Sequence, residues 1–332
     1  MARARPSGEE TLIARYFKPL ATEPGAFNLV DDAAILNVAG EDVVVTADAI
    51  VEGVHFLPQD PPDTVARKAL RVNLSDLAAK GAIPAGFVLT LALRSADEAW
   101  LEPFARALGE DAATFGCPLL GGDTVSTPGP LMIAITAFGR VPAGSMVRRS
   151  GAKVGDRVVV TGTIGDAALG LDILKGGPIA KALADDLGGR REMLIARYRI
   201  PQPRNALARV MRGHASAAMD VSDGLAGDLA KLCAASGVSA AIDVSSVPLS
   251  ATGRKLLAGG AIGIEAIVSG GDDYEILCAI SEHCYESFAQ QANQAGIAVT
   301  TIGTVIAGSA NPRFLDAQGA ELTLRRHSYS HF

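Results

Sequence analysis

Six short segments of the sequence each place an aspartate at the end of an apolar run, beside glycine or another small residue. They are Val30-Asp31-Asp32-Ala33, Val45-Thr46-Ala47-Asp48, Asn73-Leu74-Ser75-Asp76-Leu77, Gly121-Gly122-Asp123-Thr124, Met219-Asp220-Val221-Ser222-Asp223-Gly224 and Gly270-Gly271-Asp272-Asp273-Tyr274-Glu275. A single segment of this kind is explained by turn formation or helix capping, because Asp and Gly are common turn residues. Six of them, at expected strand ends and helix starts, indicate a shared carboxylate-rich site.

Gathered carboxylates repel one another. Two unit charges 4 Å apart interact by roughly 4 kcal/mol at an effective dielectric constant of about 20. The cluster is therefore tolerable only if some carboxylates are protonated or cations lie among them. Oxygen ligands without Cys or His partners indicate a hard cation, Mg²⁺ before Zn²⁺. Since proteins usually leave part of the Mg²⁺ shell to water and substrate phosphates, we also expect a phosphate-bearing ligand.

Glycine pairs beside two of the aspartates support this interpretation. Gly121-Gly122 and Gly270-Gly271 allow the backbone to approach a ligand closely. The stretch 162–165 joins an expected strand to an expected helix, where an anion can bind, although an ordinary loop explains it equally well. The sequence contains no P-loop, protein-kinase, Rossmann or nucleophile-elbow motif.

Composition narrows the class of protein and its partners. The 332 residues are 48% hydrophobic and 20% charged, which predicts a globular chain of about two domains. A net charge of −6 and an aromatic content of 5% disfavour nucleic acid as a partner. The four cysteines form no CxxC pair, and no apolar run approaches the ~20 residues of a membrane span. No apolar segment of a signal peptide follows Arg5, so we expect a cytoplasmic protein without a membrane partner.

Hydrophobic periodicity predicts alternating strands and helices, and hence α/β or α+β layers in each half of the chain. The expected strands are 33–38, 43–47, 86–93, 131–140, 157–161, 240–244, 266–269, 274–280 and 299–305. The expected helices are 11–20, 63–79, 96–115, 166–174, 204–212, 224–236, 250–258 and 282–295. Proline and glycine cluster at 142–155, which places a boundary there between domains 1–145 and 146–332.

Taken together and in order, these motifs closely resemble the thiamine-monophosphate kinase family, of the aminoimidazole-ribonucleotide-synthetase-like superfamily. The segments that carry the resemblance are 31–36, 48–56, 72–81, 121–124, 149–155, 220–224 and 270–275. The resemblance implies two α/β domains and a homodimer. In it, 1–145 binds ATP and Mg²⁺ and forms the dimer sheet or barrel, and 146–332 completes the active site. It also implies ATP-dependent phosphorylation of thiamine monophosphate to thiamine diphosphate.

The resemblance also implies roles for individual residues. Those matching the family's Mg²⁺ ligands are Asp32, Thr46, Ala47, Asp48, Asp76, Asp123, Asp220 and Asp223. Those matching its ATP contacts are Gly122, Asp123, Arg149 and Ser222, and those matching its substrate contacts are His55, Asp272 and Arg326. Two positions depart from the family pattern. Ala47 replaces a hydroxyl residue and can ligate only through its carbonyl, and Arg326 stands near the place of an aromatic residue, which Tyr329 could supply.

The chemistry of the residues agrees with this implied reaction. A phosphate acceptor is already deprotonated, so the demands are alignment and charge neutralisation rather than a covalent nucleophile. We therefore expect direct in-line transfer without a phosphoenzyme. Alternatives are an enzyme like aminoimidazole ribonucleotide synthetase or selenophosphate synthetase, and a non-catalytic nucleotide-binding regulator. Selenophosphate synthetases usually carry a reactive Cys or Sec near the N-terminus, and no cysteine precedes Asp31. A regulator would be expected to lack some of the aspartates.

Overall fold

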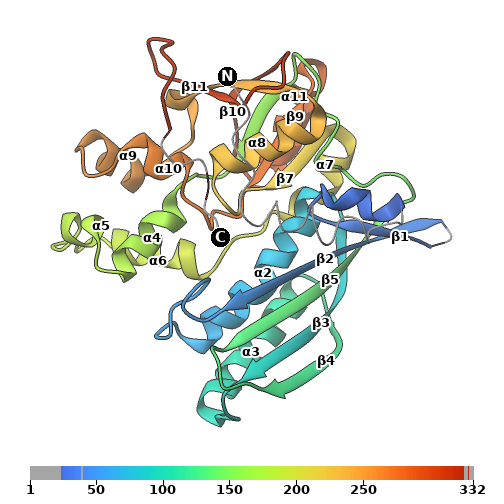
Figure 1. Cartoon of the computed structure of the whole chain (residues 1–332), viewed down its shortest axis with the longest axis vertical. Helices are drawn as coiled ribbons and strands as arrows, with labels where there is room; N and C mark the ends of the chain where they lie inside the picture. The colour runs from blue at the N-terminus through green and yellow to red at the C-terminus, as the bar shows by residue number, and fades with distance from the viewer. Residues whose placement is uncertain (1–23, 39, 325–327, 329–332) are drawn as a thin grey trace.

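The computed structural model describes residues 24–38, 40–324 and 328, and these form two mixed β-sheets with helical layers (Figure 1). The expected helix 11–20, Arg326 and Tyr329 lie outside the described residues. In Figure 1 one sheet occupies the lower half of the molecule and the other the upper half. The carboxylate-bearing segments come from both halves, so their placement depends on how the halves meet.

The lower sheet has the strand order β1-β2-β5-β3-β4, in which β3 and β4 are parallel and the other neighbours antiparallel. Its helices α2 and α3 cover one face. Along β5, Ile133 and Ile135 are buried in the core with these helices, whereas the alternate residues Ala134 and Thr136 on the opposite face are half-buried. The elements are β1 (Ala34–Val38), β2 (Glu41–Val51), α2 (Pro62–Ala79), β3 (Ile83–Leu93), α3 (Glu98–Thr114), β4 (Leu119–Ser126) and β5 (Met132–Pro142).

The upper sheet has the order β11-β8-β10-β6-β9-β7. Its core is buried on both faces, by α8 on one and by α7 and α11 on the other. The elements are β6 (Arg157–Thr161), α7 (Ala208–His214), β7 (Ala215–Asp220), α8 (Leu225–Ser236), β8 (Ser239–Asp243), β9 (Ile276–Ile280), α11 (Glu282–Gln294), β10 (Val299–Ile306) and β11 (Arg313–Leu315).

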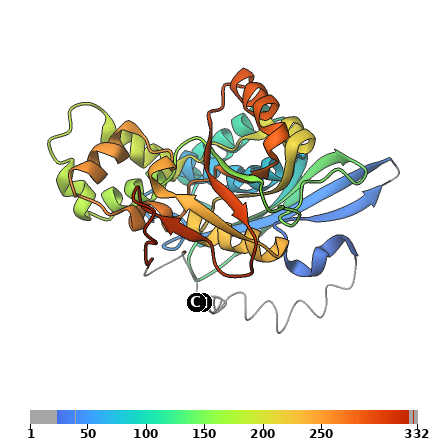
Figure 2. The ribbon, with the colours of Figure 1, turned by 90° about the horizontal axis from the view of Figure 1, so that it is seen from above.

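Short helices form a lobe beside the upper sheet, at the left of Figures 1 and 2. Leu169, Ile179, Leu194 and Leu256 join four of them in a small core of their own. The lobe helices are α4 (Asp166–Leu174), α5 (Pro178–Ala182), α6 (Arg190–Arg199), α9 (Ala251–Ala258) and α10 (Ile264–Val268). The 3₁₀ turns are η3 (Pro24–Leu29), η4 (Asn205–Leu207) and η5 (Val244–Ser246). No helix in the described part of the chain is long and apolar enough to cross a membrane.

Most of the expected elements are confirmed, and the errors share a cause. The strand expected at 266–269 is wrong, because these residues belong to α10 and to the turn that ends it. The three apolar residues Ala266, Ile267 and Val268 are too few to show a decisive period. The segment is helical here because Ile267 and Val268 are buried in the core that α8 forms with the upper sheet. The sequence analysis also missed β4, β7, β11, α5 and α6; β11 and α5 are only three and five residues long.

Helix α2 links the two halves. It packs on β2 and β5 of the lower sheet, yet Ala78 and Ala79 at its C-terminal end lie in the core between the upper sheet and α7. Near its middle, Arg71 donates to the carbonyl of Pro201, after α6. A single rigid helix therefore fixes the two sheets relative to each other, and its polar face lies where they meet.

Candidate metal and phosphate site

Three of the predicted aspartates converge at the junction of the two sheets. Asp32, Asp76 and Asp220 each offer one carboxylate oxygen, and these oxygens lie within 4.8 Å of one another. They come from the loop before β1, from α2 and from the end of β7. Asp76 and Asp220 are buried, and the Thr46 hydroxyl of β2 donates to Asp76. An all-oxygen set of this spacing fits a hard divalent cation.

Two cationic side chains, Lys80 and Arg149, form ion pairs with Asp32 of this cluster. The ammonium of Lys80 is fully buried and directs its three donors at Asp31 (2.9 Å), at Asp32 (2.5 Å) and at the carbonyl of Ala218 (2.8 Å). The Arg149 guanidinium pairs with the other oxygen of Asp32, and its Nε is buried without a hydrogen-bond partner among the described residues. The sequence analysis missed Lys80, which lies one turn of α2 after Asp76.

The structure gives the adjacent residues Asp31 and Asp32 different contacts, a difference that the sequence did not reveal. The Asp31 carboxylate accepts from Lys80, from the backbone N–H of Asp32 and from the backbone N–H of Arg149. Asp31 is thus saturated by protein donors and holds the loop in place. Asp32 belongs to the three-carboxylate cluster, as predicted for a ligand.

Burial and mutual repulsion raise the proton affinity of the cluster. Burial first, and then Asp228 and Asp48, raise the pKa of Asp220 to about 7, against a lowering effect of Ser75 and Lys80. Burial followed by Asp220 and Asp48 raises the pKa of Asp76 well above its usual range. Asp48 is exposed at the surface, yet crowding by surrounding protein and then Asp223 raise its pKa to about 6. A bound divalent cation would relieve this repulsion, so the residues present fit Mg²⁺.

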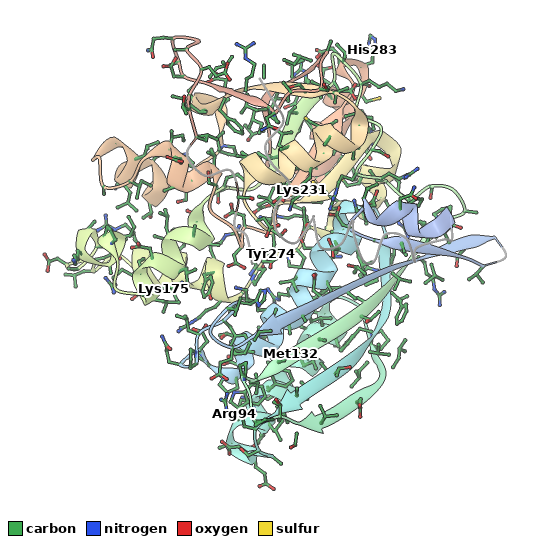
Figure 3. The ribbon with its side chains drawn as sticks, viewed as in Figure 1. Arg94, Met132, Lys175, Lys231, Tyr274 and His283 are labelled. Atoms are coloured by element: carbon green, nitrogen blue, oxygen red, sulfur yellow. The ribbon has the colours of Figure 1, made fainter. Side chains whose placement is uncertain are left out.

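The predicted metal ligand Asp223 and the predicted ATP contact Ser222 lie on the turn between β7 and α8. The buried carboxylate of Asp228 accepts from the backbone N–H of both residues, at 3.0 Å each. Lys231 bridges Asp223 (2.6 Å) and Asp228 (3.0 Å). Asp228 and Lys231 were missed by the sequence analysis, although an acidic residue in the first turn of a helix is a recognisable signal. They set the geometry of this turn, and Figure 3 shows Lys231 near the junction.

The predicted substrate contacts His55 and Asp272 are brought together by Lys68 of α2. The Lys68 side chain is 2% exposed, and its ammonium donates to the His55 carbonyl (2.8 Å) and pairs with Asp272 (3.0 Å). It also lies 3.8 Å from the centre of the Tyr198 ring, whose hydroxyl donates to the same His55 carbonyl. His55 Nδ1 accepts from the N–H of Val51, which places the proton of the neutral ring on Nε2.

The loop that carries Asp272 is held in an uncommon backbone conformation. Asp272 and Tyr274 have φ values of 69° and 51°, which non-glycine residues rarely adopt. Between them, both oxygens of the buried Asp273 accept from the N–H of Gly165. Glu275, also buried, is paired by Arg197 and Arg204. These anchors keep Asp272 and Tyr274 facing the junction, where Figure 3 shows Tyr274.

Lys68 and Asp76 lie on α2, eight residues apart, and Lys80 is the C-cap residue that follows the helix. At 1.5 Å per residue, the twelve residues from Lys68 to Lys80 span about 18 Å. The site is therefore elongated, with the His55 and Asp272 contacts at one end and the aspartate cluster at the other.

Asp123 is a predicted ligand that the structure leaves apart from the cluster of Asp32, Asp76 and Asp220. It lies on β4, a strand whose residues are all exposed, and its carboxylate accepts from the N–H of Thr124. The register joins Asp48 to Ile135, Ile135 to Leu89 and Leu89 to Gly122, so Gly122 is three strand spacings, about 14 Å, from Asp48. Gly122 has a packing role as well, since a Cβ there would lie 1.8 Å from the Leu89 carbonyl oxygen.

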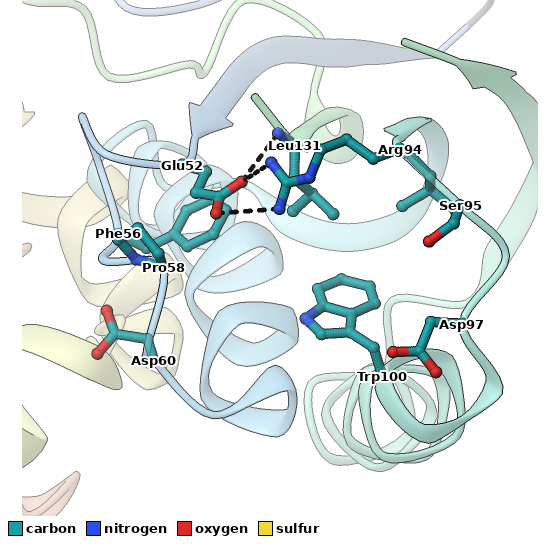
Figure 4. Close-up of a pocket in the computed structure, with 10 residues that line it drawn as sticks. Glu52, Phe56, Pro58, Asp60, Arg94, Ser95, Asp97, Trp100 and Leu131 are labelled. Carbon is teal, nitrogen blue, oxygen red and sulfur yellow. Dashed lines mark hydrogen bonds and ion pairs between the residues drawn. The ribbon is translucent and has the colours of Figure 1, made fainter. Parts of the chain in front are cut away.

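A separate pocket of about 140 Å³ lies beyond the end of β2 (Figure 4). It is lined by Phe56, Arg94 and Trp100 among others, and by none of the predicted site residues. Three of its four charged groups are paired, Arg94 with Glu52 inside the pocket and Asp60 with Arg199. The fourth, Asp97, caps α3 by accepting from the N–H of Ala99. The pocket therefore offers little uncompensated charge, in contrast to the aspartate cluster.

Two family models divide the chain as the two sheets do. Residues 30–141 match the N-terminal domain of AIR synthase related proteins, and residues 153–313 match the C-terminal domain. Fold and site thus define a two-domain AIR synthase related protein.

Comparison with known proteins narrows this class. The chain is 43% identical over 334 residues to a thiamine-monophosphate kinase from Caulobacter vibrioides, across 99% of this chain and 92% of that protein. The crystal structure of a thiamine-monophosphate kinase from Stenotrophomonas maltophilia is 37% identical, with a TM-score of 0.76 over 93% of this chain and 96% of that one. AaThiL complexed with AMPPCP and TMP is 26% identical, with a TM-score of 0.84 over the whole of both chains. The chain belongs to the thiamine-monophosphate kinase family.

The raised pKa of Asp220 gives a stability prediction for the metal-free protein. Asp220 holds its proton to about pH 7 when folded but only to its ordinary pKa of 3.8 when unfolded, so its contribution to stability is lost as the pH rises through 7. Asp220→Asn mimics the protonated form. In EDTA at pH 8 we expect it to raise the Tm by a few degrees, and at pH 4 to leave it unchanged.

Thermal unfolding of both proteins between pH 4 and 8 measures this effect. The exposed Asp185 provides the control, because Asp185→Asn should leave the pH profile of the wild type intact. Added Mg²⁺ should stabilise the wild type and not Asp220→Asn. Parallel pH profiles of wild type and Asp220→Asn, with equal stabilisation by Mg²⁺, would contradict the assignment.

Proposed function

We propose that this chain transfers the γ-phosphoryl group of ATP directly to the phosphate of thiamine monophosphate, giving thiamine diphosphate and ADP in the cytoplasm. The observation that carries the proposal is the convergence of Asp32, Asp76 and Asp220 at the junction of the two sheets, in a chain of this family. The bond from the γ-phosphorus to the bridging oxygen of ADP breaks as an acceptor phosphate oxygen bonds to that phosphorus.

The residues divide between the two ends of the elongated site. Asp32, Asp76 and Asp220, with Asp48, Asp223, the Thr46 hydroxyl and the Ala47 carbonyl, would hold Mg²⁺. When bound, Mg²⁺ neutralises phosphate charge and aligns the reacting groups. Arg149 and the Gly122 and Ser222 segments would contact ATP. His55 and Asp272, with Arg326 beyond the described residues, would contact thiamine monophosphate. Residues 1–145 would form the ATP and Mg²⁺ domain, and 146–332 would complete the site.

No covalent nucleophile is needed for this reaction. Both reactants are polyanions, and the acceptor oxygen carries its negative charge without a general base. What the protein must supply is a rigid cradle that orients the phosphates and offsets their repulsion. Lys80 and Arg149 keep Asp32 fixed at the cluster, and Asp228 keeps Asp223 fixed beside it. The cluster is therefore organised before the substrates arrive.

A direct assay tests the proposal. Purified protein should convert thiamine monophosphate and ATP into equal amounts of thiamine diphosphate and ADP in Mg²⁺, and should form neither product in EDTA. Asp48→Asn should lower kcat by about 100-fold or more, because it removes an electrostatic contribution worth several kcal/mol. Asp185→Asn serves as the control. ADP formation that does not require thiamine monophosphate, or wild-type turnover in Asp48→Asn, would contradict the assignment.

The remote position of Asp123 is explained if the enzyme is a homodimer. Strand β4 ends the lower sheet and exposes apolar side chains, with Leu119 52% and Leu120 62% exposed. Exposed edges of this kind are templates for pairing. On the opposite side, β1 covers only residues 41–45 of β2, so 46–51 has no strand partner on its outer edge in the described part of the chain.

We infer that β4 of one subunit lies along the free part of β2 in the partner subunit. A two-fold axis repeats this contact, so β4 and the free part of β2 are covered in both subunits and the assembly closes. The arrangement brings Asp123 of one subunit to the site that contains Asp48 of the partner subunit. Each active site would then contain carboxylates from both subunits.

Mixing two inactive variants tests the shared site. If Asp48 and Asp123 act from different subunits, heterodimers of Asp48→Asn and Asp123→Asn contain one intact site. Statistical reassortment should then restore about a quarter of wild-type activity. Mixing Asp48→Asn with Asp76→Asn should restore nothing, because both positions belong to the same subunit's cluster. Absence of recovery in the first mixture, with reassortment verified by differently tagged subunits, would contradict the arrangement.

Lys68 should act on the acceptor end of the site. Lys68→Met removes the ammonium that joins the His55 carbonyl to Asp272 and keeps the length of the apolar stem. We expect KM for thiamine monophosphate to rise about tenfold, as for loss of a charged hydrogen bond, with a smaller change in KM for ATP. Steady-state kinetics with each substrate varied measures this, with the exposed Lys175→Met as control. A selective rise in KM for ATP would contradict the assignment.

A further inference from the structure

An open crevice lies beside the connector between the two sheets, outside the site described above. Its volume is about 310 Å³, and Arg148 and Arg212 line it together with the hydroxyl residues Ser145, Ser150 and Ser216. Arg148 comes from the connector, and Arg212 comes from α7 of the upper half. The crevice is therefore built from two parts of the chain that are distant in sequence.

The positive charge of this crevice is not balanced by the protein. Surface arginines elsewhere, such as Arg94 and Arg157, pair with carboxylates. Neither Arg148 nor Arg212 pairs with a carboxylate in the described part of the chain. Arg148 lies over the Phe27 ring at 4.1 Å, and Arg212 donates to the carbonyl of Gly81.

A neighbouring cation adds to this excess of positive charge. Partial burial, and then Arg209 one turn earlier on α7, lower the pKa of Arg212, and no carboxylate opposes them. The nearest carboxylate that the hydrogen bonds show is Asp156, which accepts from Ser216 and pairs with neither crevice arginine. In a chain with a net charge of −6, two neighbouring arginines without a carboxylate partner favour an anionic ligand.

The crevice is coupled to the aspartate cluster through the backbone. The Arg148 carbonyl accepts from the N–H of Ala218, whose own carbonyl accepts from Lys80. The next residue along the connector, Arg149, pairs with Asp32. A ligand that holds Arg148 would thus act on the segment that positions Arg149.

We propose that this crevice binds a small phosphate-bearing anion, at a site distinct from the aspartate cluster. Two guanidinium groups and the Ser150 hydroxyl offer donors that phosphate oxygens accept, and guanidinium forks match phosphate in geometry. The hydroxyls of Ser145 and Ser216 already donate to the Pro142 carbonyl and to Asp156. The volume suits a pyrophosphate group or a phosphate ester, and the negative net charge of the chain disfavours a polymeric anion. The proposal does not depend on the reaction proposed above, because no substrate contact lies in the crevice.

Calorimetric titration of the full-length protein with inorganic pyrophosphate in EDTA tests the site. Without metal the aspartate cluster repels pyrophosphate, so binding there is suppressed. We expect one saturable site per chain, weakened about tenfold by Arg148→Gln and further by Arg148→Gln/Arg212→Gln, since each removes a charged contact. Arg157→Gln/Arg313→Gln is the matched control, because it removes the same charge from two arginines that pair with surface carboxylates and should leave binding unchanged.

Titrations with ADP and with orthophosphate distinguish a nucleotide ligand from a free anion. Binding of ADP as tight as that of pyrophosphate indicates a nucleotide, whereas binding of orthophosphate alone indicates the free anion. If Arg212→Gln fails to fold, the exposed Arg148 decides the matter alone, because Arg148→Gln leaves the buried core untouched. No saturable binding, or equal affinity in the wild type, the crevice variants and the control, would overturn the proposal. Turnover by Arg148→Gln without pyrophosphate should match the wild type, which separates this test from that of the reaction.

Discussion

Repulsion among carboxylates at the junction of the two sheets is the constraint on which the site depends. Water cannot screen the buried Asp76 and Asp220 well, and two unit charges at 4 Å cost roughly 4 kcal/mol at an effective dielectric constant of about 20. The protein offsets part of this cost with Lys80 and Arg149, which grip Asp32 from two sides. Burial, and then the remaining negative charge, raise the pKa of Asp220, and a divalent cation would relieve this repulsion. The buried carboxylates therefore lower the stability of the metal-free fold, and the same charges are the ones that would bind a divalent cation.

Helix α2 connects the charged site to both halves of the fold. Its apolar face supports the lower sheet, its C-terminal end enters the upper core, and it carries Lys68 and Asp76, with Lys80 as its C-cap. Since the helix is rigid, the proposed acceptor contacts and the aspartate cluster keep a fixed separation. Phosphoryl transfer requires reacting groups in line, and a rigid element shared by both halves provides that alignment.

The exposed edge strand of the lower sheet concerns the proposed contact between two subunits. An all-exposed β4 with apolar side chains is a liability in a monomer and an asset in a dimer. Its Gly122 backbone lies too close to Leu89 for any side chain, so the strand is built to pack flat against β3. This chain has Gly121-Gly122-Asp123 at this edge, and the close approach to Leu89 gives Gly122 a structural reason.

The sequence by itself determined the local structure and the type of chemistry. Hydrophobic periodicity predicted β6 and α4 at their observed bounds, because this signal is read within a few residues. Aspartates without Cys or His partners predicted hard-cation chemistry, and the order of the motifs predicted the family, which the comparisons confirm. Where a segment had no clear period, as at 266–269, the tertiary core decided and the predicted strand was wrong.

Only the tertiary structure decided which charged residues act together. It paired Asp31 with Lys80 and placed Asp32 in the aspartate cluster. It buried Lys68 on α2 and Lys80 at the end of that helix, and it placed Asp123 on a distant sheet edge. The decisive contacts join residues far apart in sequence, such as Arg149 with Asp32 across 117 positions and Lys80 with Ala218 across 138. A local pattern carries no information on such distances, because convergence depends on how two separately folded layers pack on one helix.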